Sequence, residues 1–396
     1  MPKTDVISEL LDRGVKEVIV RKELYEKLRK GEKISLYLGI DPTGSRLHLG
    51  HAIALRKLRD FQRLGHRVIF LIGDFTALIG DTSDKDSPRP PLSPEQISEN
   101  FRTYKAQASK ILDFSKIELK QNSEWLSKMD LKKLIHLASQ FTVQQMIKRE
   151  MYQKRIAQDR PIALHEFLYP LMQGYDSVAM DVDLEIGGND QLFNMLAGRV
   201  LQKVLKNRDK HVMTLKLLEG TDGRKMAKTY NNVINITDSP DEQYGKIMSM
   251  KDELILPYFE LCTDVPVHEI KESAQAMKAG ENPKDYKMRL AREIITLYHG
   301  SQAASQAEKE FVKIFQQRGK PSDIPEKTLS KKSYDICELL FEAGLAKSKS
   351  EARRLVEGGG VKVNDEKITD PKIIFDLGKK PLVIQVGKRH FIQIIG

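Results

Sequence analysis

The chain is poor in cysteine, and this scarcity argues against two kinds of site. Its 396 residues include two cysteines, Cys262 and Cys337, which lie far apart and form no C-x-x-C pair. A disulfide framework and a cysteine-bound zinc site are therefore not expected, and no side chain is assigned as a metal ligand. Because structural disulfides belong to oxidising compartments, their absence fits a reducing, cytoplasmic location.

Long apolar runs and two common phosphate-binding patterns are also absent. No run of about 18 apolar residues occurs, so we expect no membrane span and no membrane partner. The first residues carry acidic side chains and no apolar stretch follows them, which argues against a signal peptide. Neither G-x-x-x-x-G-K-[ST] nor G-x-G-x-x-G is present, so any phosphate chemistry must depend on other residues.

The chain does have an excess of positive charge. Lysine and arginine total 65 against 55 aspartate and glutamate, which gives a net charge of +10. Such an excess favours a polyanionic partner, nucleic acid first, although a basic enzyme without that partner has the same composition. The length exceeds what one hydrophobic core normally fills, so two or three domains are expected.

Two apolar runs with a helical pattern between them predict the start of a parallel sheet. Residues 34–40 and 67–73 have the composition of buried strands, and residues 49–64 place apolar side chains at helical spacing. Strand, helix and strand within about 40 residues form a βαβ unit. The other expected elements are short helices at 5–13 and 22–29, strands at 184–188 and 211–217, and helices through 240–300.

Two histidines stand at the predicted start of the first crossover helix. His48 and His51 are three residues apart and so share one helix face. Backbone N–H groups and the helix dipole favour an anion there, and imidazole donors add directional hydrogen bonds to phosphate oxygens. Gly50 leaves room for a nucleotide ring or ribose against the backbone. The alternative is an ordinary helix turn without a ligand.

A basic loop about 175 residues later completes the pattern. It reads Gly-Arg-Lys-Met-Ala-Lys-Thr over residues 223–229, and Lys225 and Lys228 are its point charges. Such charges can neutralise phosphates as pyrophosphate leaves. A basic loop alone is usually only solvated, but together with the histidine pair it predicts a nucleotide site.

The two motifs together resemble the H-x-G-H and K-M-x-K-[ST] signature of class I aminoacyl-tRNA synthetases. Leu49, Ala227 and Thr229 replace the commonest residues of that signature without changing the donors to phosphate. Further stretches resemble motifs of the tyrosyl-tRNA synthetases, in the bacterial type with a C-terminal RNA-binding domain, and the resemblance reaches essentially the whole chain. These stretches are residues 37–43, 169–176 and 186–191.

The resemblance implies a tyrosine pocket. Tyr37 and Asp176 would contact the phenol, and Tyr169, Gln173 and Asp81 would hold the α-ammonium. A phenol hydroxyl donates and accepts, so a hydroxyl and a carboxylate satisfy it, and phenylalanine would leave both unmatched. The spacing i, i+4 and i+7 places three of these residues on one helix face, although that face could equally be polar surface.

The resemblance also implies contacts to ATP, which enters as a substrate together with Mg²⁺. Contacts to the ribose and adenylate are implied for Gly39, Asp41, Gly50, Gly188, Asp190 and Gln191. The candidate catalytic residues are Thr43, His48, His51, Lys85, Arg89, Lys225, Lys228 and Thr229. Glu185 stands where many relatives carry Gln, and we interpret it as the mark of a subtype, with no contact assigned.

The C-terminal residues contain a basic helix followed by a glycine turn and a strand. This part is similar to a small RNA-binding domain that also occurs in a ribosomal protein. Lys347, Lys349, Arg353 and Arg354 are predicted to form a phosphate-binding stripe, the alternative being a solvated helix face. Four further cations resemble the helical anticodon-side domain of the family: Lys284, Lys287, Arg289 and Arg292.

The sequence therefore predicts an α/β protein with a Rossmann-like parallel-sheet catalytic domain, followed by a helical domain and a small α+β RNA-binding domain. The expected boundaries are 1–235 with a helical insertion at about 126–160, then 236–315, a linker at 316–330, and 331–396. The expected reaction is activation of L-tyrosine with ATP and its transfer to tRNA(Tyr), by a homodimer.

Three other functions compete with this interpretation. A tryptophanyl-type synthetase shares the fold, but the pair Tyr37 and Asp176 speaks against it. A non-catalytic RNA-binding regulator would not need His48, His51 or the lysines of the basic loop. A small nucleotidyltransferase also uses H-x-G-H, but it would not need residues 331–396.

Overall fold

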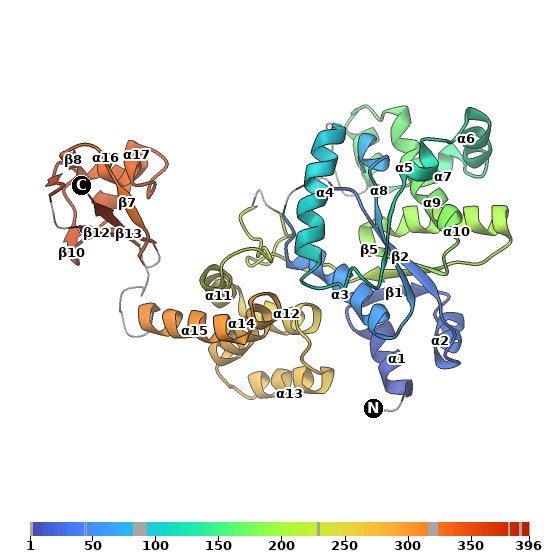
Figure 1. The fold of residues 1–396 in the computed structure, drawn as a ribbon, viewed down its shortest axis with the longest axis horizontal. Helices are drawn as coiled ribbons and strands as arrows, with labels where there is room; N and C mark the ends of the chain where they lie inside the picture. Colours follow the sequence, from blue (N-terminus) through green and yellow to red (C-terminus); the bar gives the residue numbers. More distant parts are fainter. Residues whose placement is uncertain are drawn as a thin grey trace. The chain divides into compact units, whose positions relative to one another are not determined.

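The computed structural model of the chain describes residues 3–42, 44, 46–81, 93–227, 230–315, 324–378, 381–387 and 390–395 (Figure 1). The chain divides into two compact units, Met1–Ala304 and Ser305–Gly396, and each is described by itself. Within the described ranges, no helix combines the length and the apolar character needed to cross a bilayer.

A six-stranded sheet in the order β1-β6-β5-β2-β3-β4 forms the centre of the first unit. Its strands are β1 (Val15–Ile19), β2 (Ser35–Ile40), β3 (Arg67–Ile72), β4 (Glu118–Gln121), β5 (Leu184–Gly188) and β6 (His211–Leu215). All neighbours are parallel except β1, which pairs antiparallel with β6 at one edge. The chain order runs outward from β2 to β4 on one side and from β5 to β6 on the other, where β1 is added at the edge. The carboxyl ends of these two strands therefore form a topological switch point, where open α/β sheets bind ligands.

Helices connect the strands and carry the residues of the switch point. α3 (Leu49–Arg63) joins β2 to β3 and buries Ile53, Leu55, Leu58 and Phe61 toward the sheet. The other helices of this part are α1 (Lys3–Asp12), α2 (Arg21–Arg29), α4 (Pro94–Ala108), α9 (Tyr169–Met180) and α10 (Leu192–Lys206). Short 3₁₀ turns follow β3 and β5, at η1 (Thr76–Leu78) and η3 (Asn189–Gln191).

Between β4 and α9 the chain forms short helices rather than one long one. They are α5 (Ser123–Leu126), α6 (Leu131–Ala138), α7 (Val143–Ile147), α8 (Glu150–Ala157) and η2 (Leu164–Phe167). Asp130 and Thr142 cap α6 and α7 by accepting backbone N–H bonds, which starts a new helix at each point. The expected helical insertion is therefore made of separate short helices.

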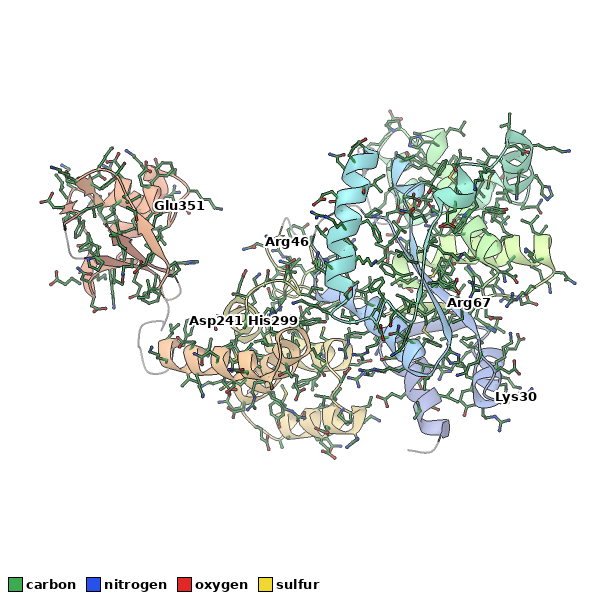
Figure 2. All side chains as sticks on the ribbon, in the orientation of Figure 1. Lys30, Arg46, Arg67, Asp241, His299 and Glu351 are labelled. Carbon is green, nitrogen blue, oxygen red and sulfur yellow. The ribbon has the colours of Figure 1, made fainter. Side chains whose placement is uncertain are left out.

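The last part of the first unit is helical, as the sequence predicts. Its elements are α11 (Pro240–Ser249), η5 (Asp252–Leu254), α12 (Ile255–Cys262), α13 (Val267–Lys278), α14 (Pro283–His299) and the start of α15 (Ser301–Phe315). Ser239 and Asn282 cap α11 and α14, each followed by proline at the first helical position. These two helices pack against each other, and Figure 2 marks Asp241 on the first and His299 at the end of the second.

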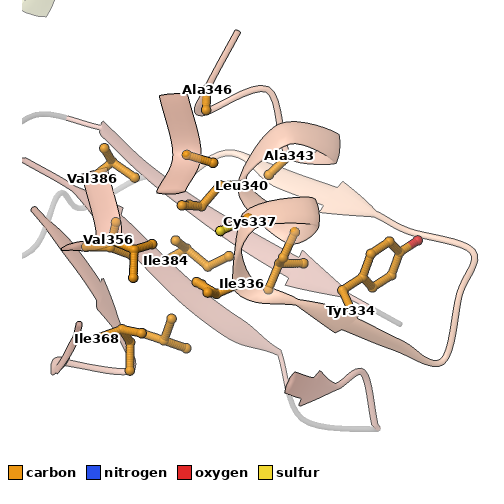
Figure 3. Packing of buried hydrophobic residues seen from close by; sticks show 14 of the residues in the cluster. Tyr334, Ile336, Cys337, Leu340, Ala343, Ala346, Val356, Ile368, Ile384 and Val386 are labelled. Carbon is orange, nitrogen blue, oxygen red and sulfur yellow. The ribbon is translucent and has the colours of Figure 1, made fainter. Parts of the chain in front are cut away.

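The second unit is a small α+β body with its own core. Its elements are β7 (Glu326–Thr328), β8 (Ser333–Asp335), α16 (Ile336–Glu342), α17 (Lys349–Glu357), β9 (Val361–Val363), β10 (Glu366–Ile368), β11 (Ile374–Asp376), β12 (Leu382–Val386) and β13 (His390–Ile395). One sheet runs β10-β9-β12-β13-β7, and β8 pairs with β11. Ile336, Leu340, Val356 and Ile384 meet in the core (Figure 3).

The predicted fold class is confirmed, with differences at the sheet edges and in the linker stretch. The sequence does not predict β1 and β4, because charged side chains interrupt both strands and hide the apolar pattern. Residues 326–328 fall within the stretch expected to be a linker, yet they form β7 and pair parallel with β13. Residues 80–94 contain four prolines and several charges, which predicts a surface loop, and they lie mostly outside the described residues.

Candidate active site

A cavity of about 420 Å³ opens at the switch point between β2 and β5. Residues from the ends of both strands line it, together with the start of α3, one face of α9 and the basic loop. The predicted site residues that line it are Tyr37, Gly39, Asp41, His48, Gly50, His51, Asp81, Tyr169, Gln173, Asp176, Gly188, Asp190, Gln191 and Lys225. Five predicted residues lie outside the described residues: Thr43, Lys85, Arg89, Lys228 and Thr229.

The end of the cavity deepest in the sheet contains the pair expected at the phenol. Tyr37 on β2 is fully buried, and its hydroxyl lies 2.9 Å from Ser177 Oγ. Asp176 on α9 is 2% exposed; it accepts hydrogen bonds from Trp125 Nε1 at 2.7 Å and Asn122 Nδ2 at 3.3 Å. Burial raises the pKa of Tyr37 and of Asp176 well above the usual values. Tyr37 and Asp176 thus bring a hydroxyl and a carboxylate to the lining of the same cavity.

Asp41, just after β2, fixes the hydroxyl of Tyr169 across the cavity. Tyr169 Oη donates to Asp41 Oδ2 at 2.8 Å, and Thr76 Oγ1 donates to Asp41 Oδ1 at 2.8 Å. Asn122 Nδ2 in turn donates to Thr76 Oγ1 at 3.0 Å, which links this group to Asp176. A continuous hydrogen-bonded network therefore lines this wall of the cavity, with its acceptors already oriented.

A second network forms the opposite wall, around Glu185 on β5. Gln173 Nε2 donates to Glu185 Oε1 at 3.0 Å. The same carboxylate forms a buried ion pair with Lys210, and Lys210 Nζ also donates to Ser177 Oγ at 2.7 Å. The contact of Glu185, left open by the sequence, is therefore with Gln173 and Lys210.

At the mouth of the cavity lie the polar residues that follow β5. Gln191 Nε2 donates to Asp81 Oδ2 at 2.7 Å and to Asp190 Oδ2 at 3.0 Å. This amide therefore lies between two carboxylates, and the end of β5 is held next to the segment that follows η1. The arrangement presents carboxylate oxygens toward the cavity, the acceptors that an ammonium group or ribose hydroxyls require.

The histidine motif begins α3, as expected. The rings of His48 and His51 stack with their centroids 3.7 Å apart, and the His48 backbone N–H donates to His51 Nδ1 at 3.2 Å. A Cβ added at Gly50 would lie 3.0 Å from the His48 ring and 3.3 Å from Met226 Sδ. Glycine at this position therefore allows the basic loop to approach the helix start closely.

Asn232 holds the basic loop beside α3. Its Nδ2 donates to Asp222 Oδ1 at 2.8 Å and to the Lys225 carbonyl oxygen at 3.1 Å, and its Oδ1 accepts from the Ala227 N–H at 2.9 Å. The following segment pairs with the helix start, because the Leu49 N–H donates to the Ile234 carbonyl oxygen at 2.9 Å. Lys225 is thereby brought to the same cavity as the histidines.

Several of these residues were not found from the sequence. Asn122 and Trp125 follow β4, and the rule that ligands bind at the carboxyl ends of parallel strands would have identified them had that strand been predicted. Ser177 and Lys210 carry no motif, so no sequence signal indicated them. Within the described ranges, no group of three or more His, Cys, Asp and Glu side chains is arranged to hold a metal ion.

The predicted RNA-binding cations differ in their surroundings. Lys347, Lys349, Arg353 and Arg354 are all exposed on the second unit, and Lys349 Nζ lies 3.1 Å from Glu338 Oε1. In the helical part, by contrast, Lys287 lies mostly buried and pairs with Asp252 at 2.5 Å. Arg289 pairs with Glu269. Lys287 and Arg289 thus have structural contacts within the first unit.

Comparison with known proteins shows the family of this chain. The family described as tRNA synthetases class I (W and Y) matches residues 29–316, and the tyrosine–tRNA ligase SYY-like C-terminal domain matches residues 316–394. The chain is 48% identical over 398 residues to the tyrosine–tRNA ligase of Carboxydothermus hydrogenoformans, covering 98% of this chain and 97% of that protein. It is 47% identical over 390 residues to the tyrosine–tRNA ligase of Thermotoga maritima, with the same two coverages.

Solved structures show the same fold. A C-terminally truncated mitochondrial tyrosyl-tRNA synthetase from Coccidioides posadasii aligns with a TM-score of 0.62 at 25% identity, covering 77% of this chain and 91% of that one. The tyrosyl-tRNA synthetase of Archaeoglobus fulgidus, solved with L-tyrosine, aligns with a TM-score of 0.62 at 23% identity, covering 78% and 100%. Because the family models and the full-length relatives agree, this chain belongs to the tyrosyl-tRNA synthetase family of class I aminoacyl-tRNA synthetases.

Proposed function

We propose that this chain activates L-tyrosine with ATP, forming tyrosyl-adenylate and pyrophosphate, and then transfers tyrosine to the 3′ end of tRNA(Tyr). One observation carries the proposal. A single cavity has a buried hydroxyl and carboxylate, Tyr37 and Asp176, in its depth and a histidine pair beside a lysine at the start of α3. The first pair matches a phenol, and the second group matches phosphates.

In this proposal the residues act by positioning and by stabilising charge. Tyrosine binds with its phenol at Asp176, and its ammonium lies among Gln173, Tyr169 and Asp81. Its carboxylate then attacks the α-phosphorus of ATP in line, and pyrophosphate leaves. His48, His51, Lys225 and Lys228 donate to the phosphate oxygens as charge builds up, so no side chain serves as a nucleophile.

The other nucleotide contacts are proposed for residues at the ends of β2 and β5. Gly39, Gly50 and Gly188 let the nucleotide approach the backbone, and Asp41, Asp190 and Gln191 accept or donate to ribose and adenylate. Thr43, Lys85, Arg89 and Thr229 are proposed to face the phosphates. The chemistry that Mg²⁺ supplies, carried in with ATP, is neutralisation of the leaving pyrophosphate. We name no protein ligand for it.

Amino-acid-dependent exchange of pyrophosphate into ATP tests this function directly. Run with each of the twenty amino acids, the exchange is expected to require tyrosine. Exchange driven by tryptophan instead would favour the sister enzyme. A chain with no exchange but tight tRNA binding would be the non-catalytic regulator.

The second unit is proposed to bind tRNA through its exposed stripe on and before α17. A chain ending at Phe315 removes β7 to β13 of this unit, α17 included, while keeping every proposed tyrosine and ATP contact. We expect pyrophosphate exchange within a few-fold of the full chain and a sharp loss of tRNA charging. The salt dependence of tRNA binding should also become flatter, by a slope of about 0.7–0.9 for every phosphate that the shorter chain does not reach. Equal loss of exchange and charging would place the unit in the catalytic fold instead.

A homodimer in the cytoplasm is also proposed. Large apolar side chains are exposed along the insertion that precedes α9, including Leu131 at 71% and Leu164 at 80%. Ile135, Val143 and Ile156 of the same insertion are exposed as well. Exposed apolar side chains gathered in one segment favour a protein partner, and a second copy of the chain is the simplest one. Both cysteines are buried free thiols, which fits a reducing compartment.

A further inference from the structure

A lysine without any motif lies buried behind the tyrosine cavity. Lys210, directly before β6, is 0% exposed, and its partner Glu185 on β5 is 2% exposed. Their ion pair crosses between the two parallel strands. Two charges taken out of water are unfavourable unless further hydrogen bonds satisfy them, so the surroundings of this pair need an explanation.

The fold makes room for this ammonium group. A Cβ added at Gly198 on α10 would overlap Lys210 Nζ and would lie 2.7 Å from Ser177 Oγ. Glycine at this position therefore leaves the space that the lysine head occupies between α9, α10 and the sheet. Lys210 Nζ donates to Ser177 Oγ at 2.7 Å as well as to Glu185, so two of its donors are satisfied.

Glu185 lines the cavity next to Gln173, and the two side chains are hydrogen-bonded. Because a carboxylate can only accept hydrogen bonds, the Gln173 atom that faces Glu185 must be the NH₂ group, and Nε2 lies 3.0 Å from Glu185 Oε1. The carbonyl oxygen of the same amide is then oriented away from Glu185. Gln173 Oε1 is buried and finds no hydrogen-bond partner among the described residues, and Gln173 lines the cavity.

From this arrangement we infer that Lys210 is a positioning residue for recognition of the α-ammonium group of the substrate. Its ammonium group holds the Glu185 side chain in place through the ion pair, and Glu185 holds Gln173 with its carbonyl oxygen available to an ammonium donor. The inference rests on the proposed function, because it assigns the free acceptor to the ammonium of tyrosine.

Removal of the lysine charge should release the Gln173 amide. Glu185 would be buried without its counter-ion, which is unfavourable, and its side chain would lose the position that the ion pair gives it. Gln173 Nε2 would then lose the acceptor that orients the amide. The Gln173 carbonyl oxygen would no longer be fixed toward the substrate ammonium, so binding of the ammonium end would weaken.

Three ligands separate this effect from general damage to the pocket. L-Tyrosine has both ends, tyramine lacks the carboxylate, and 3-(4-hydroxyphenyl)propionate lacks the ammonium. Binding of each to the full chain is measured by calorimetry. In Lys210→Met we expect the Kd of tyrosine and tyramine to rise about tenfold or more. The Kd of the propionate should stay within about twofold.

Two further variants serve as controls. Tyr37→Phe removes a hydroxyl at the phenol end and leaves Lys210, Glu185 and Ser177 in place, so it should weaken all three phenolic ligands by the same factor. Lys210→Met combined with Glu185→Gln leaves no buried charge, and the new amide oxygen can still accept from Gln173. This double variant should bring the Kd of tyrosine back to within about threefold of the original chain. Because it buries no unpaired charge, it can still be measured if Lys210→Met does not fold.

The outcomes distinguish the two levels of the proposal. An unaltered chain that does not bind tyrosine overturns the proposed function itself. If that chain binds tyrosine while Lys210→Met weakens all three ligands equally, or none of them, only the role of Lys210 is overturned. A double variant as weak for tyrosine and tyramine as the single one also overturns it, because the lysine would then act other than through the charge of Glu185.

Discussion

Replacing Asp176 by asparagine tests the phenol end of the cavity with little change in shape. The carboxylate accepts from Trp125 Nε1 on one oxygen and from Asn122 Nδ2 on the other. It still has lone pairs for a phenol hydroxyl, since an ionised carboxylate offers about four acceptor sites. Asparagine has one acceptor oxygen for three donors, which are the Trp125 indole, the Asn122 amide and the phenol hydroxyl. Its own NH₂ group would therefore face one of these donors.

The expected cost follows from the kind of hydrogen bond that is removed. A hydrogen bond to a charged group contributes about 1.5–3 kcal/mol, so tyrosine should bind about 10- to 150-fold more weakly to Asp176→Asn. Phenylalanine has no hydroxyl to lose, so its Kd should change far less. The discrimination between the two amino acids should therefore fall by most of that factor.

Equilibrium dialysis with both amino acids measures the effect, and circular dichroism checks that the variant is folded. Asp183→Asn is the matched control, because Asp183 is a largely buried carboxylate at the opposite end of β5 that accepts from Ser35. That variant should leave both dissociation constants unchanged. A variant Asp176→Asn that still discriminates tyrosine from phenylalanine as well as the unaltered chain would refute the placement of the phenol.

Three other predictions concern catalysis, assembly and pH. His51→Ala should slow tyrosine activation more than tenfold, or about 1.4 kcal/mol of barrier, with an unchanged tyrosine Kd in rapid-quench and binding assays. Leu131→Glu should shift sedimentation toward a monomer, whereas Ile374→Glu on the second unit should not, although Ile374 is 66% exposed against 71% for Leu131. Burial lowers the pKa of His66 from 6.5 to about 4. The unfolded chain therefore takes up the proton first as pH falls, and the free energy of unfolding should drop across that window. His66→Gln should remove this part of the decline in urea titrations at several pH values.

The sequence was sufficient to predict the strands at the centre of the sheet but not those at its edges. β2 and β3 are nearly continuous apolar runs, because a parallel strand is covered on both faces. β4 reads Glu-Leu-Lys-Gln and lies at an edge, where charged side chains reach solvent. Because β4 was not predicted, the sequence did not indicate that Asn122 follows the end of a strand.

The same limit applies to the site. The motif residues could be named because each lies in a stretch that resembles the family, and the described ones line one cavity. The side chains that form hydrogen bonds and ion pairs with those residues could not be named from the sequence. Glu185 meets Lys210 only because β5 and β6 pair with Leu184 opposite His211, and a register between strands is a tertiary property.

The indole that donates to Asp176 has a practical consequence, because Trp125 is the only tryptophan in the chain. Light at the long-wavelength edge of protein absorption excites indole but not phenol, so free tyrosine adds no signal. The emission of the whole protein then comes from one ring that is hydrogen-bonded to the carboxylate at the base of the cavity. Arrival of a phenol at that carboxylate changes the environment of the indole. The protein therefore contains its own optical reporter of an occupied pocket, and no label needs to be attached.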